Sequence, residues 1–135
     1  MSIKSYKDLV VWQKSIALVE EVYVATEKFP EKEKYRLINQ ICRAAISIPS
    51  NIAEGSSRKS TKEFLRFIRV SQGSVAECET QLIISTKLGY IDDSDFSGLY
   101  EKLKEISVML HFLYNSLKRK ESNSDSQILK LSDSQ

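Results

Sequence analysis

The sequence predicts an all-α protein, an antiparallel four-helix bundle with up-down-up-down topology. Two features of the chain lead to this fold class. Four segments carry apolar residues every three or four positions, which places those side chains along one face of a helix. Helix breakers are scarce, because the 135 residues include only four glycines and two prolines. A chain of this length fits one domain, and four helices joined by short loops pack as antiparallel neighbours.

The first helix is expected between Ser5, which can cap it together with Asp8, and the Phe29-Pro30 pair. Two apolar stripes run along it. The stripe expected to face the core comprises Leu9, Trp12, Ile16, Val19, Tyr23 and Thr26. A second stripe comprises Val11, Leu18, Val22, Ala25 and Phe29. The second stripe either widens the core-facing surface or forms a subunit interface, because contiguous exposed apolar surface usually marks association.

The second helix is predicted to begin at Pro30, with Glu31 and Glu33 near its positive end, and to end at Gly55. Pro49 lies inside this helix, where it removes one backbone donor and predicts a kink. The expected core stripe comprises Ile38, Ile41, Ala45, Ile48 and Ile52.

Capping signals delimit the third and fourth helices. Ser60 followed by Glu63 is a capping box for the third helix, and Gly89 suits the C′ position at its other end. Residues 92–95 supply a cap and acidic first-turn residues for the fourth helix. The two core stripes comprise Phe64, Ile68, Ser71, Val75, Cys78 and Leu82, then Phe96, Leu99, Leu103, Ile106, Leu110, Leu113 and Leu117. Small side chains predict a close approach of the third helix to another helix at Gly73, Ser74 and Ala76.

Residues 1–120 are assigned to the bundle and residues 121–135, rich in Ser, Asp, Asn and Gln, to a disordered polar tail. The sequence shows no secretory signal and no apolar run of the ~20 residues that a membrane span needs. We therefore expect a cytoplasmic protein with no membrane partner. Cys42 and Cys78 are expected to be reduced, buried thiols, and neither a metal site nor a cofactor is expected.

The net charge of +2 is unevenly distributed along the chain. Residues 121–135 contain three acidic residues and one lysine, which leaves +4 for residues 1–120. Residues 43–69 alone carry six basic and two acidic residues, a net of +4, and so account for this surplus. Most of these cations recur at helical spacing and point away from the predicted core. We call them the basic stripe, which comprises Arg58, Lys59, Lys62, Arg66 and Arg69.

The basic stripe has two interpretations. Arginine forks suit phosphate oxygens, and clustered cations gain affinity by releasing the counterions that nucleic acids condense. The alternative is an ordinary solvated helix face, because charged outer faces are the rule on bundle helices.

Polar residues on the second and third helices also have two interpretations. Arg43, Ser47, Asn51 and Glu54 lie along one side of the second helix, and Glu77, Glu79 and Gln81 lie on the third. An interhelical network, with Arg43 paired to a carboxylate of the third helix, fixes register. A paired-carboxylate hydrolase is the alternative, but no nucleophile or positioned histidine accompanies these residues. His111 is expected to lie at the flank of the fourth helix, off its core stripe. No catalytic residue is assigned, and an enzyme is not expected.

Together these motifs resemble a known family, the four-helix-bundle proteins named after intervening sequences in bacterial 23S rRNA genes. The resemblance covers nearly all of residues 6–117. It is carried by Tyr6-Lys7-Asp8-Leu9-Val10-Val11-Trp12-Gln13-Lys14, Gln40-x-x-Arg43-Ala44-Ala45, Ser47 to Gly55, Arg58-Lys59-Ser60-Thr61-Lys62-Glu63-Phe64, Gly73-Ser74, Glu77-x-Glu79-Thr80-Gln81-Leu82 and Leu88-Gly89-Tyr90-Ile91. The chain departs from the family pattern at Ser56-Ser57, Ser71-Gln72 and Cys78, which affects packing and loop shape rather than the basic stripe.

The resemblance implies a left-handed antiparallel bundle that assembles as a homopentamer around a central channel. It also implies kinship with the accessory proteins of diversity-generating retroelements, which are similar pentamers that bind nucleic acid and a reverse transcriptase. The functional hypothesis is a non-enzymatic oligomer that binds RNA or DNA through backbone phosphates, with the basic stripe in contact. The alternative is a protein-binding scaffold, or an accessory subunit of a partner such as a reverse transcriptase.

Overall fold

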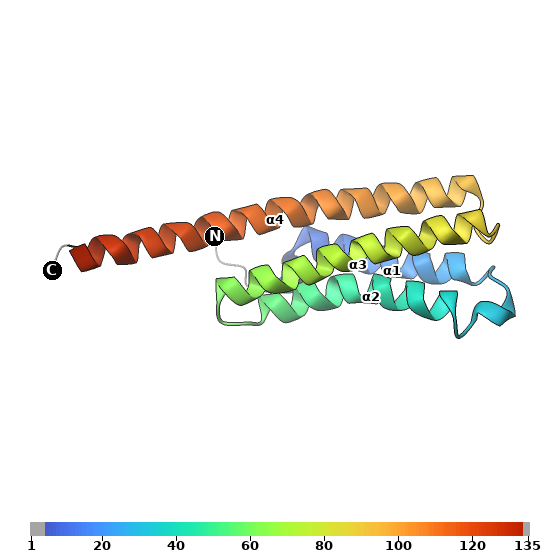
Figure 1. Cartoon of the computed structure of the whole chain (residues 1–135), viewed down its shortest axis with the longest axis horizontal. Coiled ribbons are helices and arrows are strands. Elements are labelled where there is room, and N and C mark those ends of the chain that lie inside the picture. Colours follow the sequence, from blue (N-terminus) through green and yellow to red (C-terminus); the bar gives the residue numbers. More distant parts are fainter. Residues whose placement is uncertain (1–4, 134–135) are drawn as a thin grey trace.

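The computed structural model describes residues 5–133, with side chains as far as Ser124, and these residues form helices joined by short connections. Successive long helices run antiparallel, and each packs against two others: α1 and α3 both contact α2 and α4 (Figure 1). The described residues contain no strand, so the all-α prediction and its four packed helices are confirmed. The elements are η1 (Tyr6–Asp8), α1 (Val10–Thr26), η2 (Glu31–Glu33), α2 (Leu37–Ser56), α3 (Thr61–Lys87) and α4 (Asp93–Asp133).

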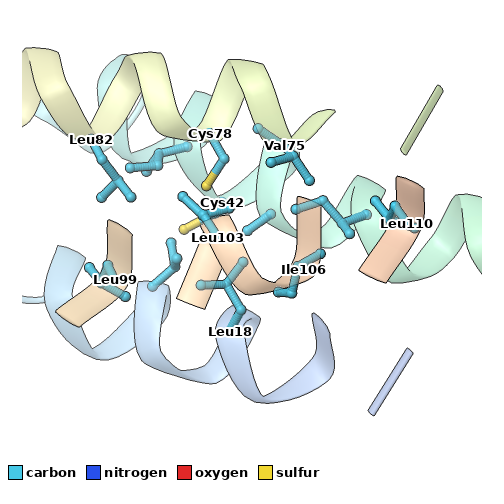
Figure 2. Packing of buried hydrophobic residues seen from close by; sticks show 14 of the residues in the cluster. Leu18, Cys42, Val75, Cys78, Leu82, Leu99, Leu103, Ile106 and Leu110 are labelled. Carbon is cyan, nitrogen blue, oxygen red and sulfur yellow. The ribbon is translucent and has the colours of Figure 1, made fainter. Parts of the chain in front are cut away.

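The core lies between the four helices and is built from aliphatic side chains of all of them. Leu18 of α1, Leu82 of α3 and Leu103 of α4 are among its fully buried members, and the two cysteines face the same space (Figure 2). In the part of the chain that the structure describes, no helix combines the length and apolar character needed to cross a membrane.

The second stripe of α1 widens the core-facing surface, as one of its two interpretations predicted, and it lies deeper in the core than most of the first stripe. The buried residues of this helix are Val11, Leu18 and Val22 of the second stripe, Thr26 of the first, and Ser15, which belongs to neither. Both stripes are apolar, so spacing alone could not decide between them. Ser15 and Thr26 are tolerated inside because each hydroxyl donates to a carbonyl of its own helix, that of Val11 at 2.7 Å and that of Tyr23 at 3.0 Å. Most of the first stripe is left at the flank of the bundle.

The start of α2 also differs from the prediction. Pro30 precedes the short turn η2 instead of opening the helix, and α2 begins only at Leu37. Glu33 still stabilises the N-terminal, positive end of α2, because its carboxylate accepts a hydrogen bond from the Leu37 backbone N–H at 3.2 Å. Pro49 is buried inside α2, and the helix continues through it to Ser56.

The capping predictions for α3 and α4 are confirmed, whereas the one for the first helix is wrong: Ser5 caps the short helix η1, and α1 follows Leu9, which forms no side-chain cap bond. Ser60 accepts the Glu63 N–H through its hydroxyl at 3.1 Å at the start of α3. Gly89 has a φ of 80°, and the bonds from Gly89 N to Thr86 O and from Tyr90 N to Ser85 O close a Schellman motif. Asp92 caps α4 through the Asp95 N–H at 2.7 Å.

The close approach of α3 to another helix that was expected at Gly73, Ser74 and Ala76 is found at Ser74, whose hydroxyl lies 2.8 Å from that of Ser47 on α2, but not at Gly73. A Cβ added to Gly73 would meet nothing within 4 Å, so the expectation of overpacking there is wrong for this bundle. A Cβ added to Gly55 would lie 2.6 Å from the Phe67 Cβ. Gly55 therefore sets how closely the end of α2 approaches α3.

Helix α4 does not end near Lys120. It continues to Asp133, past the end of the other three helices, where a disordered tail was predicted (Figure 1). The polar composition suggested a tail, but residues 121–133 contain neither glycine nor proline to stop a helix that is already formed. The extension leaves the bundle at the end where α2 and α3 are connected (Figure 1).

Candidate nucleic-acid interface

The five residues of the basic stripe lie together at the end of the bundle where α2 and α3 are connected. Arg58 and Lys59 belong to the α2–α3 connection, and the other three lie on the first half of α3. All five are exposed, because the opposite side of α3 is anchored in the protein by Phe64, Phe67 and Ile68. The predicted orientation of the stripe is therefore confirmed, while its role in binding is not tested by this geometry.

Two of the five cations are paired with carboxylates. The Arg58 guanidinium lies 2.9 Å from the Glu54 carboxylate, and the Arg66 guanidinium lies 4.0 Å from that of Glu63. Exposed ion pairs of this kind contribute little stability, so both arginines can exchange a glutamate for a phosphate at small cost. The remaining three, Lys59, Lys62 and Arg69, form no ion pair with any carboxylate that the structure describes.

Aromatic rings hold the arginines in place. The Arg58 and Arg66 guanidinium carbons lie 5.1 and 4.7 Å from the centroid of the Phe67 ring. Phe67 is only 7% exposed, so this ring is a fixed support. Cation–π contact of this kind restricts the arginine side chains without neutralising their charge. Two guanidinium groups from different elements thus contact the same buried ring.

Helix α4 adds cations that the sequence interpretation missed. The Arg69 guanidinium carbon lies 3.8 Å from the centroid of the Tyr114 ring, and the Lys118 ammonium lies 5.9 Å from the same centroid. Lys118 is followed by exposed Arg119 and Lys120. The Lys-Arg-Lys run was visible in the sequence, but only the packing of α3 on α4 shows that its first residue, Lys118, continues the basic stripe. The acidic Glu121 ends this run.

A polar groove between α2 and α3 is a second candidate site. Its volume is about 370 Å³. The Ser74 hydroxyl donates to the Ser47 hydroxyl at 2.8 Å across the helices, and the Asn51 amide donates to the Ser47 carbonyl at 2.8 Å. The groove is lined by Tyr35, Asn39, Gln40, Arg43, Ala44, Ser47, Ser74, Glu77 and Gln81.

The interhelical network predicted for this groove forms only in part. Arg43 shares the groove with Glu77 but forms no ion pair with any described carboxylate, so the predicted pairing of Arg43 is wrong. The described residues of the groove include no histidine or cysteine, and each serine hydroxyl is engaged with a neutral partner. The hydrogen bond between the Ser74 and Ser47 hydroxyls links α3 to α2 across the groove and helps to fix the register of the two helices.

The cysteines offer no reactive thiolate. Both thiols are free and buried, as predicted. Burial raises the pKa of Cys42, and burial together with the proximity of Cys42 raises the pKa of Cys78 to about 12. Both thiols are therefore protonated at neutral pH. Among the described residues, no three histidine, cysteine or carboxylate side chains gather where a metal ion could bind.

An apolar groove between α1 and α2 contains the stripe that α1 leaves outside the core. Its volume is about 360 Å³. The floor includes Pro49, which is buried, while Trp12, Ile16 and Val19 are half-buried along one wall. The lining residues are Tyr6, Trp12, Ile16, Val19, Ile46, Pro49, Ser50 and Ala53. Apolar surface of this kind usually marks association with another protein.

Comparisons with known proteins agree with this architecture. The model of the 23S rRNA-intervening sequence protein family matches residues 7–112. A crystal structure from Bacteroides thetaiotaomicron, described as a protein of unknown function from the S23 ribosomal protein family, is similar with a TM-score of 0.72. Identity is 23%, over 78% of this chain and 96% of that chain, so this similarity shows the fold alone. No curated protein is similar enough to count as a match.

Proposed function

Because this chain belongs to the 23S rRNA-intervening sequence protein family, we propose that it is a non-enzymatic oligomeric bundle that binds RNA or DNA through backbone phosphates. The observation that supports this function best is the exposed basic stripe at one end of the bundle, continued by Lys118 on α4. Its partner is a polyanion rather than a small substrate, because the exposed cations are spread over three elements: the α2–α3 connection, α3 and α4. The proposed location is the cytoplasm, where such a partner is available.

The chemistry of the basic surface favours binding over catalysis. Arginine and lysine supply donors to phosphate oxygens, and three of the five cations of the stripe have no acidic partner among the described residues. A hydrolase would need a nucleophile or a general base within reach of the bound phosphate. The acidic residues that accompany the stripe, Glu54 and Glu63, are engaged with Arg58 and Arg66 instead.

The binding test uses fluorescence anisotropy with several RNA and DNA probes of unrelated sequence at ~50 mM salt. We expect the chain to bind all of them with similar affinity, because phosphate contacts carry no sequence information. Absence of binding to every probe at this salt concentration would overturn the nucleic-acid function and favour the scaffold function below.

The proposed assembly is a homopentamer. Support comes from the apolar groove between α1 and α2, which a single chain leaves open, and from the resemblance set out above. In a closed cyclic oligomer, each subunit contacts the next through the same two surfaces. Repetition of the basic stripe around that ring would convert weak phosphate contacts into avidity.

Ile16→Glu is expected to weaken this assembly. Ile16 lines the apolar groove, and burial of a new carboxylate in a subunit interface is unfavourable. Size exclusion with light scattering should give about five times 15.5 kDa for the unmodified chain and a smaller mass for the variant. Ala17→Glu is the matched control, because Ala17 is exposed, lies ~100° around the helix and lines no part of the groove. A monomeric mass for the unmodified chain at micromolar concentration would contradict the pentamer.

A protein-binding scaffold, for example an accessory subunit of a reverse transcriptase, is the second candidate function. One observation favours it: Phe112 is 65% exposed and Val108, one turn earlier on α4, is 52% exposed. Two large apolar side chains on successive turns are a suitable anchor for a helix of another protein. This surface lies outside the apolar groove, so a partner could bind there while the bundle is assembled.

A further inference from the structure

Arg69 differs from the other arginines of the basic stripe in how it is held. Its guanidinium carbon lies 3.8 Å from the Tyr114 ring centroid, the shortest cation–π distance among the described residues. At this distance the flat guanidinium lies against the face of the ring. Its nitrogen also donates to the Gln72 side-chain oxygen at 3.0 Å. The side chain is thus fixed from two sides and still exposed.

The partners of Arg69 are neutral. Arg58 and Arg66 each lie near a glutamate, whereas Arg69 is positioned by an aromatic ring and an amide. The positive charge of the guanidinium is therefore not offset by any carboxylate among the described residues. One of its flat faces is covered by Tyr114, and the residue as a whole remains exposed. A fixed, charged and flat surface of this kind suits a nucleobase.

We propose that Arg69, supported by Tyr114, is a base-stacking platform, and that the basic surface therefore selects single-stranded over double-stranded nucleic acid. This inference rests on the proposed function and specifies its ligand. Phosphates contact Lys59, Lys62 and Arg66 of the basic stripe and Lys118 on α4, while an unpaired base stacks on the Arg69 guanidinium. A duplex can supply the phosphates but not the base, because its bases are stacked on one another.

Arg69→Lys tests the platform, because it keeps the charge and removes the flat guanidinium. Anisotropy titrations at one low salt concentration would compare single-stranded RNA and DNA with the corresponding duplexes and with an abasic single strand. For the unmodified protein we expect tighter binding to the single strands that carry bases than to the duplexes. For Arg69→Lys we expect about tenfold weaker binding to those single strands, as for loss of one stacking contact, and unchanged binding to duplex and abasic probes.

Lys62→Gln is the matched control on the same helix, since it removes a phosphate contact and should weaken binding to all probes by the same factor. Tyr114→Phe keeps the ring and should retain the single-strand preference, whereas Tyr114→Leu should lose it. A substitution that only loosened the packing of α3 on α4 would change the melting temperature without changing the ratio of single-strand to duplex affinity.

Two results would overturn the platform and leave the proposed function standing. One is Arg69→Lys binding single strands as tightly as the unmodified protein while Lys62→Gln weakens binding. The other is Arg69→Lys weakening single-strand, duplex and abasic binding equally. If the unmodified protein binds no probe at all, the proposed function and the platform both fail.

Discussion

Gly55→Ala should destabilise the bundle by about 1–3 kcal/mol, the usual cost of overpacking a closely packed site. The new methyl group would lie 2.6 Å from the Phe67 Cβ and 3.0 Å from a Phe64 ring carbon, so the end of α2 must move away from α3. Neither neighbour can simply rotate away, because a Cβ is fixed by its backbone and Phe64 is buried. Thermal or urea unfolding of the variant measures the change in the free energy of unfolding.

Gly73→Ala is the matched control for this substitution. Gly73 is also inside a helix, but a Cβ there meets nothing within 4 Å. The higher helix propensity of alanine should therefore stabilise this variant by roughly 0.5–1 kcal/mol. Equal free energies of unfolding for the two variants would contradict the close approach of α2 to α3 at Gly55.

Replacement of Lys62, Arg66 and Arg69 together with glutamine should weaken single-strand binding by roughly 600-fold at ~50 mM salt. Each of the phosphate contacts of Lys62 and Arg66 contributes about eightfold, at about the 0.7 power of the salt concentration, and base stacking on Arg69 contributes about tenfold. The three side chains are exposed, so the variant should keep its melting temperature and its assembled mass. The loss should be similar for probes of different sequence. Replacement of the exposed cations Lys32, Lys34 and Lys87, which lie outside the basic stripe, is the control for total charge.

Local signals in the sequence predicted the parts of the fold that depend on a few neighbouring residues. Ser60 and Gly89 were identified as helix caps because a hydroxyl before a helix and a positive φ after it are local requirements. The outward direction of Lys62 and Arg66 followed from the helical period and the positions of the apolar residues. These features need no knowledge of which helices pack together.

The parts that were missed depend on contacts between distant segments. Spacing could not decide which stripe of α1 faces the core, since that depends on where α2 and α4 lie. Gly55 and Gly73 are both small residues in helices, and only the position of Phe67 distinguishes them. Tyr114 joined the candidate interface because α3 packs on α4, which brings together residues 45 positions apart in the sequence.

The salt dependence of binding tests the central claim most directly, namely that the basic stripe contacts nucleic-acid phosphates. The slope of log affinity against log salt concentration would be measured for the unmodified protein and for the triple glutamine variant with the same single-stranded probe. We expect a steep negative slope for the unmodified protein and a slope flatter by about 1.4 for the variant, at roughly 0.7 for each of the phosphate contacts of Lys62 and Arg66. Identical slopes for the two proteins, or a slope near zero for the unmodified protein, would contradict the central claim.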